Sequence, residues 1–146
     1  MRTKIPSGSG LSYCFVCGQK NPIGLKLIFY IEDKSCIVTE FTPKQEHCGW
    51  EKIVHGGIIC SVMDEAMSWT VLHIAKLVGV TKELNIKFKR PILINEKITI
   101  RSKVKNKNTQ EVRLSSEVIN KEGIICAIGE GVYAILDEEK MKKISK

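Results

Sequence analysis

The sequence predicts an α+β fold in which a curved antiparallel β-sheet wraps around one long central α-helix. The patterns along the chain are, in order, a β-hairpin, one long apolar segment with helical spacing, and about four strands of alternating residues. The helical segment is hydrophobic almost all round, so most of its sides must be covered. The 146 residues suffice for one hydrophobic core, and we expect a single domain over residues 1–146.

The hairpin is expected in the stretch LKLIFYIEDKSCIVTEFTP, which begins at Leu25. This stretch holds two segments rich in β-branched and aromatic residues, joined by a polar turn at residues 32–35. The connection KQEHCGWEKIV then leads to the helix, which we expect from about Gly57 to Leu77. The apolar residues of this helix are Ile58, Ile59, Val62, Met63, Ala66, Met67, Val71, Ile74 and Leu77.

The remaining strands follow the helix. In ELNIKFKRP the apolar residues Leu84, Ile86 and Phe88 alternate with polar ones, and KITIRSKVK and EVRLSSEV repeat the pattern. A last strand, IICAIGEGVYAIL, contains Gly129 and Gly131, which predict a bulge or a sharp bend. The charged tail DEEKMKKISK is expected to be a frayed helical end.

Composition and charge narrow the class of protein. Hydrophobic residues make up 43% and charged residues 27% of the chain, as in ordinary globular domains. The net charge of +7 favours partners that carry phosphate groups. The N-terminal stretch MRTKIPSGSGLSY has no apolar run of signal-peptide length, and no segment is long and apolar enough to span a bilayer. We expect a cytoplasmic protein with no membrane partner.

The stretch VHGGIICSVMDEAMSW places two acids, Asp64 and Glu65, inside the apolar helix. An ionised carboxylate there is costly unless it is paired or reaches water. The two side chains point about 100° apart, so we expect one to face solvent and the other a cavity. Ser68 lies one turn beyond Asp64, where its hydroxyl could orient the carboxylate or a water molecule.

Two glycines, Gly56 and Gly57, open the same helix. Backbone N–H groups at a helix start have no intrahelical acceptor and lie at the positive end of the helix dipole. They could hold the developing negative charge of a carbonyl oxygen. Gly56 and Asp64 are eight residues apart, or roughly 12 Å along one helix. If both act on one carbon, the acid must come from a second, two-fold-related copy of the chain.

These residues resemble the hotdog-fold acyl-CoA thioesterases, in particular their PaaI-like and 4-hydroxybenzoyl-CoA thioesterase branch. The resemblance lies in His55, Gly56 and Gly57 followed by Asp64 nine residues after the histidine. The segment CFVCGQKNPIGLKL before the hairpin and the strand ELNIKFKRPI are also similar to those of many members. The resemblance to the family extends over about residues 14–136, which we take as the core of the domain.

The resemblance implies hydrolysis of an acyl-CoA thioester without a cofactor, in a homodimer or a dimer of two such dimers. It implies that the Gly56 amide polarises the carbonyl and that Asp64 of the partner subunit is the nucleophile or general base. Glu65 departs from the aromatic-CoA relatives, but the spacing favours Asp64. The expected catalytic set is Asp64, Gly56, His55, Gly57, Ser68 and Thr81, with Ser68 and Thr81 at positions of water-orienting hydroxyls and His55 as a hydrogen-bonding residue near the helix cap. The expected substrate-binding set is His47, Glu65, Asn85, Lys87, Lys89 and Arg90.

Several structural interpretations compete with these assignments. The His-Gly-Gly motif could simply make a tight turn into a helix. The basic strand faces could be solvated surface rather than a site for CoA phosphates, and no aromatic residues lie between the lysines as nucleic-acid binding would need. Cys14 and Cys17 have the spacing of zinc ligands, but no second Cys-x-x-Cys occurs and His47 with Cys48 would complete a site only by accident of folding. We expect no metal, and small apolar packing for both thiols.

Two other functions fit the same scaffold. A non-catalytic acyl-CoA sensor would bind ligand without needing Asp64. A dehydratase would pair a loop histidine such as His47 with the helical acid, but the proline-bounded histidine loop of such enzymes is absent from HCGWEKIV.

Overall fold

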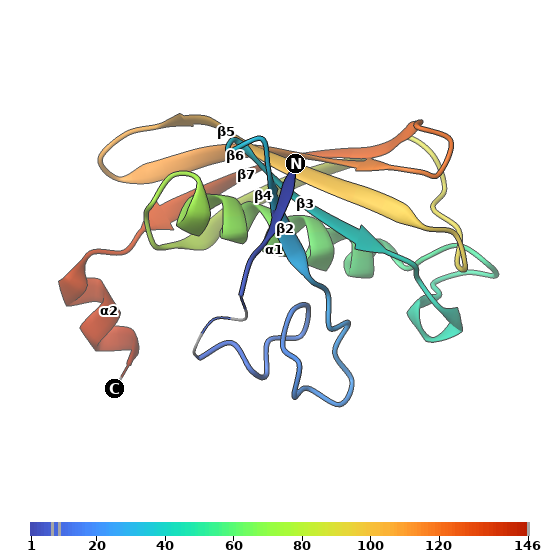
Figure 1. The fold of residues 1–146 in the computed structure, drawn as a ribbon, viewed down its shortest axis with the longest axis horizontal. Helices are drawn as coiled ribbons and strands as arrows, with labels where there is room; N and C mark the ends of the chain where they lie inside the picture. The colour runs from blue at the N-terminus through green and yellow to red at the C-terminus, as the bar shows by residue number, and fades with distance from the viewer. Residues whose placement is uncertain (7, 9, 146) are drawn as a thin grey trace.

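A computed structural model describes residues 1–6, 8 and 10–145. Its strands form one antiparallel sheet in the order β1-β2-β3-β5-β6-β7-β4 (Figure 1). The strands are β1 (Arg2–Lys4), β2 (Phe29–Glu32), β3 (Cys36–Phe41), β4 (Gly79–Phe88), β5 (Ile98–Lys107), β6 (Glu111–Ile119) and β7 (Ile125–Ile135). The helices are η1 (Gln45–His47), α1 (Gly56–His73) and α2 (Glu138–Ile144).

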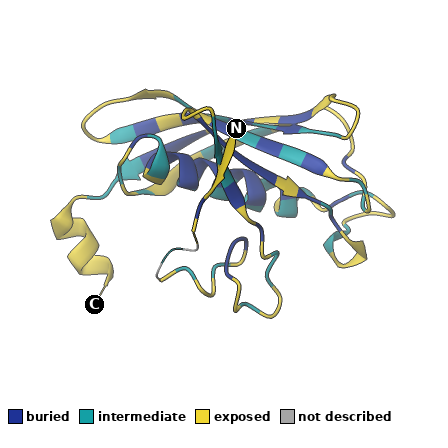
Figure 2. Ribbon diagram, viewed as in Figure 1, coloured by how far each residue is buried: buried dark blue, intermediate teal, exposed yellow. Residues whose placement is uncertain are grey.

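Helix α1 lies against one face of this sheet and carries the centre of the core. Its side chains Val62, Met63 and Met67 are fully buried, as are Ile100 and Leu114 on the facing strands. Figure 2 shows the buried residues concentrated where α1 meets the sheet. Burial of apolar surface between the two layers is the main source of stability for such a fold. The predicted α+β arrangement of one sheet around one long helix is therefore confirmed.

The predicted hairpin is also confirmed. Strands β2 and β3 pair in register, with Glu32 opposite Cys36. The turn between them places Asp33 and Lys34 at φ angles of 51° and 62°, in the left-handed region. Left-handed backbone at such positions matches the right-handed twist of the two strands.

Helix α1 ends earlier than the sequence predicts, at His73 instead of Leu77. The chain leaves the helix because Lys76 adopts a left-handed φ of 61°. The N–H groups of Ala75 and Leu77 bond back to the carbonyls of Thr70 and Val71, which closes the last turn. The apolar pattern continues past this point because Ala75 and Leu77 still pack against the core.

The sequence predicts a bulge or a sharp bend at Gly129 and Gly131, and the strand pairing excludes the bulge. The register between β4 and β7 runs through both glycines without a shift. A Cβ atom at Gly129 would lie 2.9 Å from Met63 Cε, and one at Gly131 would lie 2.6 Å from Tyr133 Cε2. Glycine is needed at both positions because a larger residue would clash with these side chains. Its small size lets α1 and the Tyr133 ring approach the strand closely.

A segment that we call the leader, residues 10–28, connects β1 to β2. It forms turns but no helix or strand. In Figure 1 it lies beneath α1, on the side away from the sheet. The leader therefore covers a part of the helix that the sheet leaves open.

The ends of the chain carry two short elements. The sequence predicts α2, in which the Asp137 carboxylate accepts a hydrogen bond from the Lys140 N–H. It gives no sign of β1. Strand β1 is held at the edge of the sheet by ion pairs from Arg2 to Glu32 at 3.0 Å and to Glu40 at 3.1 Å. Within the described part of the chain, no helix combines the length and hydropathy that a bilayer crossing requires.

Candidate active site

The start of α1 presents one backbone N–H group without an acceptor. His55 is the N-cap residue, and its Nδ1 accepts a hydrogen bond from the Gly57 N–H at 2.9 Å. A Cβ atom at Gly57 would lie 3.0 Å from this nitrogen, so the absence of a side chain at Gly57 leaves room for the His55 imidazole. The N–H of Gly56 has no hydrogen-bond acceptor among residues 1–6, 8 and 10–145. This amide can therefore bind an external oxygen at the positive end of the helix.

Gly56 lines a cavity of about 350 Å³. Most of its wall is apolar, and two cations, Lys89 and Arg90, also line it. Phe88 is half exposed here, and its Cζ would lie 3.4 Å from a Cβ atom at Gly56. The other lining residues are Ile53, Val54, Ile59, Pro91 and Ile92. The cavity offers an apolar wall, a hydrogen-bond donor and positive charge, which suits an amphipathic anionic ligand.

Asp64 is held in place by two hydroxyl groups. Its Oδ1 accepts hydrogen bonds of 2.7 Å from Thr81 Oγ1 on β4 and 2.7 Å from the Tyr133 hydroxyl on β7. Burial, together with the neighbouring Asp64 carboxylate, raises the pKa of Tyr133, so its hydroxyl keeps the proton that it donates. Oδ2 makes no hydrogen bond to the part of the chain that the structure describes. The hydrogen bonds from the sheet therefore fix the carboxylate through Oδ1.

Tyr133 is a hydrogen-bond partner of Asp64 that the sequence did not lead us to expect. Both hydrogen bonds to Asp64 Oδ1 come from the sheet, and Ser68, which we expected to orient Asp64 or a water molecule, lies beside the Tyr133 hydroxyl. A signal was present in the strand itself. Gly129, Gly131 and Tyr133 are two residues apart and therefore lie on the same face of the strand. Two glycines next to a tyrosine on the core-facing side leave room for the tyrosine ring to lie flat along the strand.

Glu65, the second acid, points away from Asp64 toward the leader. Its Oε1 accepts a hydrogen bond from Cys14 Sγ at 3.4 Å. The ligand atoms of Cys14, Cys17 and Glu65 all lie within 4.8 Å of one another. Burial of Cys17, and next the Glu65 carboxylate, raise the pKa of its thiol. The two adjacent acids thus have separate surroundings, Asp64 at the sheet edge and Glu65 under the leader.

His47 takes part in the helix start rather than in a charged cluster. It lies in η1, where its Nδ1 accepts a hydrogen bond from the Lys44 N–H at 2.8 Å. Its carbonyl oxygen accepts the N–H of His55 at 2.9 Å. His47 therefore fixes the residue that caps α1.

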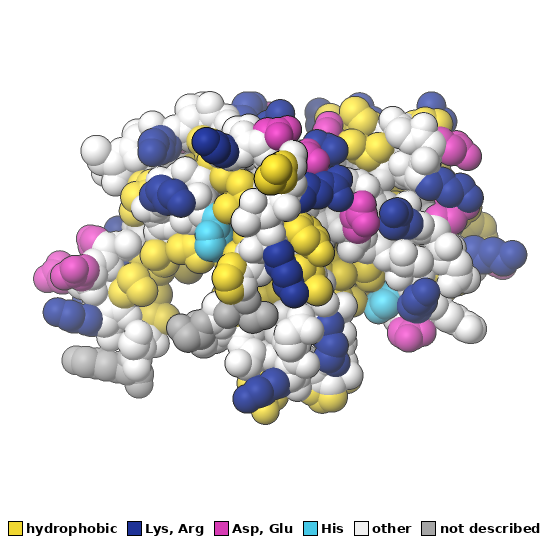
Figure 3. Space-filling model, viewed as in Figure 1, with side chains coloured by type: hydrophobic (Ala, Val, Ile, Leu, Met, Phe, Trp, Pro, Cys, Tyr) yellow, Lys and Arg dark blue, Asp and Glu magenta, His cyan; other side chains and the backbone are white. Residues whose placement is uncertain are grey.

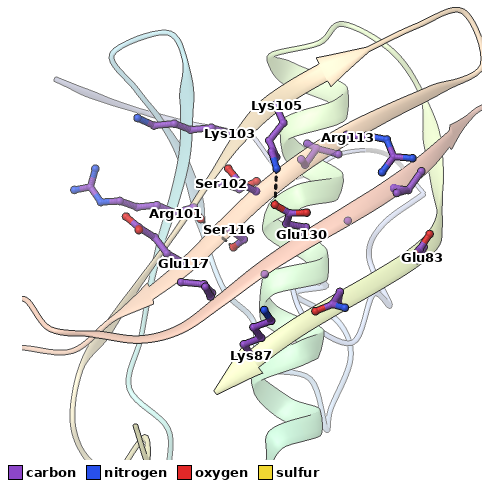
Figure 4. A pocket seen from close by; sticks show the side chains of 17 residues that line it. Glu83, Lys87, Arg101, Ser102, Lys103, Lys105, Arg113, Ser116, Glu117 and Glu130 are labelled. Carbon is purple, nitrogen blue, oxygen red and sulfur yellow. Dashed lines mark hydrogen bonds and ion pairs between the residues drawn. The ribbon is translucent and has the colours of Figure 1, made fainter. Parts of the chain in front are cut away.

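The basic strand residues lie mainly on the outer face of the sheet, where they line a groove of about 650 Å³ (Figure 4). The helix lies behind the sheet in this view, so the groove and α1 are on opposite faces. Lysine and arginine side chains are interspersed with acidic ones over the sheet in Figure 3. The charged and amide residues of the groove are Glu83, Asn85, Lys87, Arg101, Lys103, Lys105, Arg113, Glu117 and Glu130.

The structure thus divides the predicted substrate-binding set. Lys89 and Arg90 lie at the Gly56 cavity, whereas Asn85 and Lys87 line the outer groove. Part of the positive charge in the groove is neutralised within the protein, because Lys105 forms an ion pair with Glu130 and lowers the pKa of that carboxyl.

Known proteins share sequence features with this chain. The sequence profile of the thioesterase superfamily matches residues 51–127, more than half of the chain, a range that holds Gly56, Asp64 and Thr81. An uncharacterized protein of Schizosaccharomyces pombe is 29% identical over 101 residues, which are 66% of this chain and 58% of that protein. The chain therefore spans less than two thirds of the length of this relative.

Two solved structures have a similar fold. The Escherichia coli PaaI protein from the phenylacetic acid degradation operon aligns with a TM-score of 0.69 and 21% identity, over 75% of this chain and 83% of that one. A hypothetical thioesterase from Streptococcus pneumoniae, solved with coenzyme A, also aligns with a TM-score of 0.69, at 15% identity over 74% of this chain and 84% of that one. The profile match and the shared architecture together establish that this chain is a hotdog-fold member of the thioesterase superfamily.

Proposed function

We propose that this protein is an acyl-CoA thioesterase that hydrolyses a thioester to a free acid and CoA as a homodimer. One observation carries the proposal: α1 presents a backbone amide without an acceptor at Gly56 and a carboxylate fixed by two hydroxyls at Asp64. Thioester hydrolysis needs a donor for the carbonyl oxygen and a group that attacks or activates water. The similarity to a thioesterase solved with coenzyme A supports the same substrate class.

A dimer brings these two groups together. Within one chain they are roughly 12 Å apart along α1, too far to act on one carbonyl carbon. Strand β4 is an edge of the sheet, ten residues long, and exposes the apolar side chains Val80 and Phe88. Two such edges can pair antiparallel about a two-fold axis, because an edge strand has unused N–H and C=O groups. That pairing sets the two α1 helices side by side in opposite directions, with Gly56 of one chain near Asp64 of the partner subunit.

The proposed chemistry uses few groups. The thioester carbonyl oxygen accepts the Gly56 N–H, which stabilises the negative charge that develops on it. Asp64 of the partner subunit either removes a proton from the attacking water or attacks the carbonyl carbon itself to form an anhydride that water then cleaves. In both routes the carbon–sulfur bond breaks and the CoA sulfur leaves as a thiolate that takes up a proton. Thr81 and Tyr133 keep the carboxylate in position.

The cations at the cavity suit the other end of the substrate. Lys89 and Arg90 lie beside the apolar wall next to Gly56. CoA carries several negative charges on phosphate groups, which charged side chains bind through strong hydrogen bonds. We assign the phosphates to this rim and the acyl and pantetheine parts to the apolar cavity.

The test is a thiol-release assay with a panel of short, long and aromatic acyl-CoAs. We expect saturable CoA release from at least one class of acyl chain. Binding of acyl-CoA without release of thiol from any of them would indicate the sensor function instead. Hydration of an enoyl-CoA without thiol release would indicate the dehydratase.

A further inference from the structure

Beyond the proposed catalytic function, one cluster of side chains has the composition of a metal site. It joins the leader to α1 through Cys14, Cys17 and Glu65, whose ligand atoms all lie within 4.8 Å of one another. We propose that these three residues bind one Zn²⁺ ion, with water as the fourth ligand, and that the ion fastens the leader to α1 beside the active site.

The geometry fits the ion. Zinc–sulfur bonds of about 2.3 Å and zinc–oxygen bonds of about 2.0 Å place tetrahedral S and O ligands about 3.5 Å apart and two S ligands about 3.8 Å apart. Cys14 Sγ and Glu65 Oε1 are separated by 3.4 Å. Cys14 and Glu65 are half-buried and Cys17 is buried, so the cluster lies at the boundary between the core and solvent.

The turn that contains Cys14 and Cys17 brings their two thiols close together. The N–H of Gly18 bonds to the carbonyl of Cys14 at 2.9 Å and so folds the Cys-x-x-Cys segment back on itself. A Cβ atom at Gly18 would lie 2.5 Å from the backbone N and O of Cys14 and from the Ser12 carbonyl oxygen. No side chain fits there, so the glycine is required for the turn.

Charge balance also permits a divalent cation in the cluster. Two thiolates and one carboxylate carry three negative charges, and zinc supplies two positive ones. Zinc therefore replaces two thiol protons, which pass to solvent, and no net charge is added to the half-buried cluster.

A metal bound between the leader and α1 would order a segment that has no regular secondary structure of its own. Residues 10–28 have no helix or strand to hold them, and a stretch of this length without regular structure is uncommon in a compact domain unless other contacts order it. The sequence alone gives only two ligands and leads to the expectation of no metal. Folding supplies the third ligand, Glu65, from a helix 51 residues away.

The experiment measures zinc in the 146-residue chain, purified under reducing conditions without chelator. The protein is dialysed first against Zn²⁺ and then against metal-free buffer. We expect about one zinc per chain, and less than a tenth of that in Cys14→Ser, Cys17→Ser and Glu65→Gln. Cys48→Ser is the matched control, a half-buried cysteine outside the cluster, and should keep its zinc. In the wild type, Co²⁺ should give a sulfur-to-cobalt charge-transfer band, and zinc at 100 times its Kd should raise the thermal midpoint by about 5–10 °C.

Two results would overturn the proposal. One is reduced wild-type protein that holds less than a tenth of an equivalent of zinc after dialysis, a result that needs no variant to fold. The other is equal loss of zinc from Cys48→Ser and Cys14→Ser. Asp64→Asn separates this proposal from the catalytic one, because it should bind zinc like the wild type whether or not it hydrolyses thioesters.

Discussion

Asp64 and Glu65 are adjacent acids, and their different contacts predict different effects of the same chemical change. Asp64→Asn removes the charge and basicity of the group held by Thr81 and Tyr133. We expect kcat to fall by about 100-fold or more, the loss typical of a missing general base or nucleophile. Steady-state thiol release, with the folded state checked by circular dichroism, measures this.

Glu65→Gln is the control for that substitution, since it makes the same change one residue away on the side of the leader. We expect its kcat to fall by less than about tenfold. Both variants are assayed after chelator treatment, so that their metal content is equal. Similar losses in the two variants, or a larger loss in Glu65→Gln, would show that Asp64 is not the acid used.

Gly56 permits a substitution that removes only the amide hydrogen. It is the first residue of α1, a position where proline is favoured, and His55 has the extended ψ of 130° that a residue before proline requires. Gly56→Pro should lower kcat by about 100- to 1,000-fold, because one oxyanion donor is lost. Gly56→Ala keeps the N–H group, and its kcat should fall much less. If alanine and proline reduce kcat equally, crowding against Phe88, and not the amide, explains the loss.

At the scale of single elements, β4 performs two tasks. It supplies Thr81 to Asp64, and it leaves one ten-residue edge of the sheet unpaired among the described residues. Natural proteins rarely leave a long edge with exposed apolar residues open, because it pairs readily with another strand. If the proposed dimer forms through this edge, the same strand links subunit pairing to the position of Asp64.

The substitution Val80→Lys tests this role of β4. Val80 is 45% exposed on the edge strand, and a lysine there places a charge in the proposed interface, where charged edge residues disfavour strand pairing. We expect a shift from dimer to monomer in sedimentation velocity and loss of thiol release. Ile128→Lys, an exposed position on the inner strand β7, should stay dimeric. A monomeric wild type, or a dimeric Val80→Lys, would exclude pairing through this edge.

At the scale of the whole molecule, a site shared between subunits makes a prediction that a site within one chain does not. In the proposed homodimer, Gly56→Pro and Asp64→Asn should each inactivate both sites. When equal amounts are mixed and allowed to exchange subunits, half of the dimers are mixed, and each has one site with both residues intact. Activity should recover to about a quarter of the wild-type value. No recovery despite proven exchange would mean that both groups act within one chain.

The local pattern of the sequence is enough to predict most of the elements. The hairpin, the long helix and the four later strands follow from periods of two and 3.6 residues, which depend only on neighbouring positions. The end of α1 could not be predicted, since the apolar pattern runs past the left-handed turn at Lys76. The close packing at Gly129 and Gly131 could not be predicted, because it depends on the Met63 and Tyr133 side chains that lie over these glycines.

The sequence by itself determined the order of the elements, the free amide at the start of the helix and the choice of Asp64 as the candidate acid. These depend on residues within a few turns of each other. Only the tertiary structure decided that Tyr133 holds Asp64 and that Glu65 meets Cys14, pairs separated by 69 and 51 residues. Contacts over such distances depend on how the sheet and the leader close around α1, and no pattern in neighbouring residues records that closure.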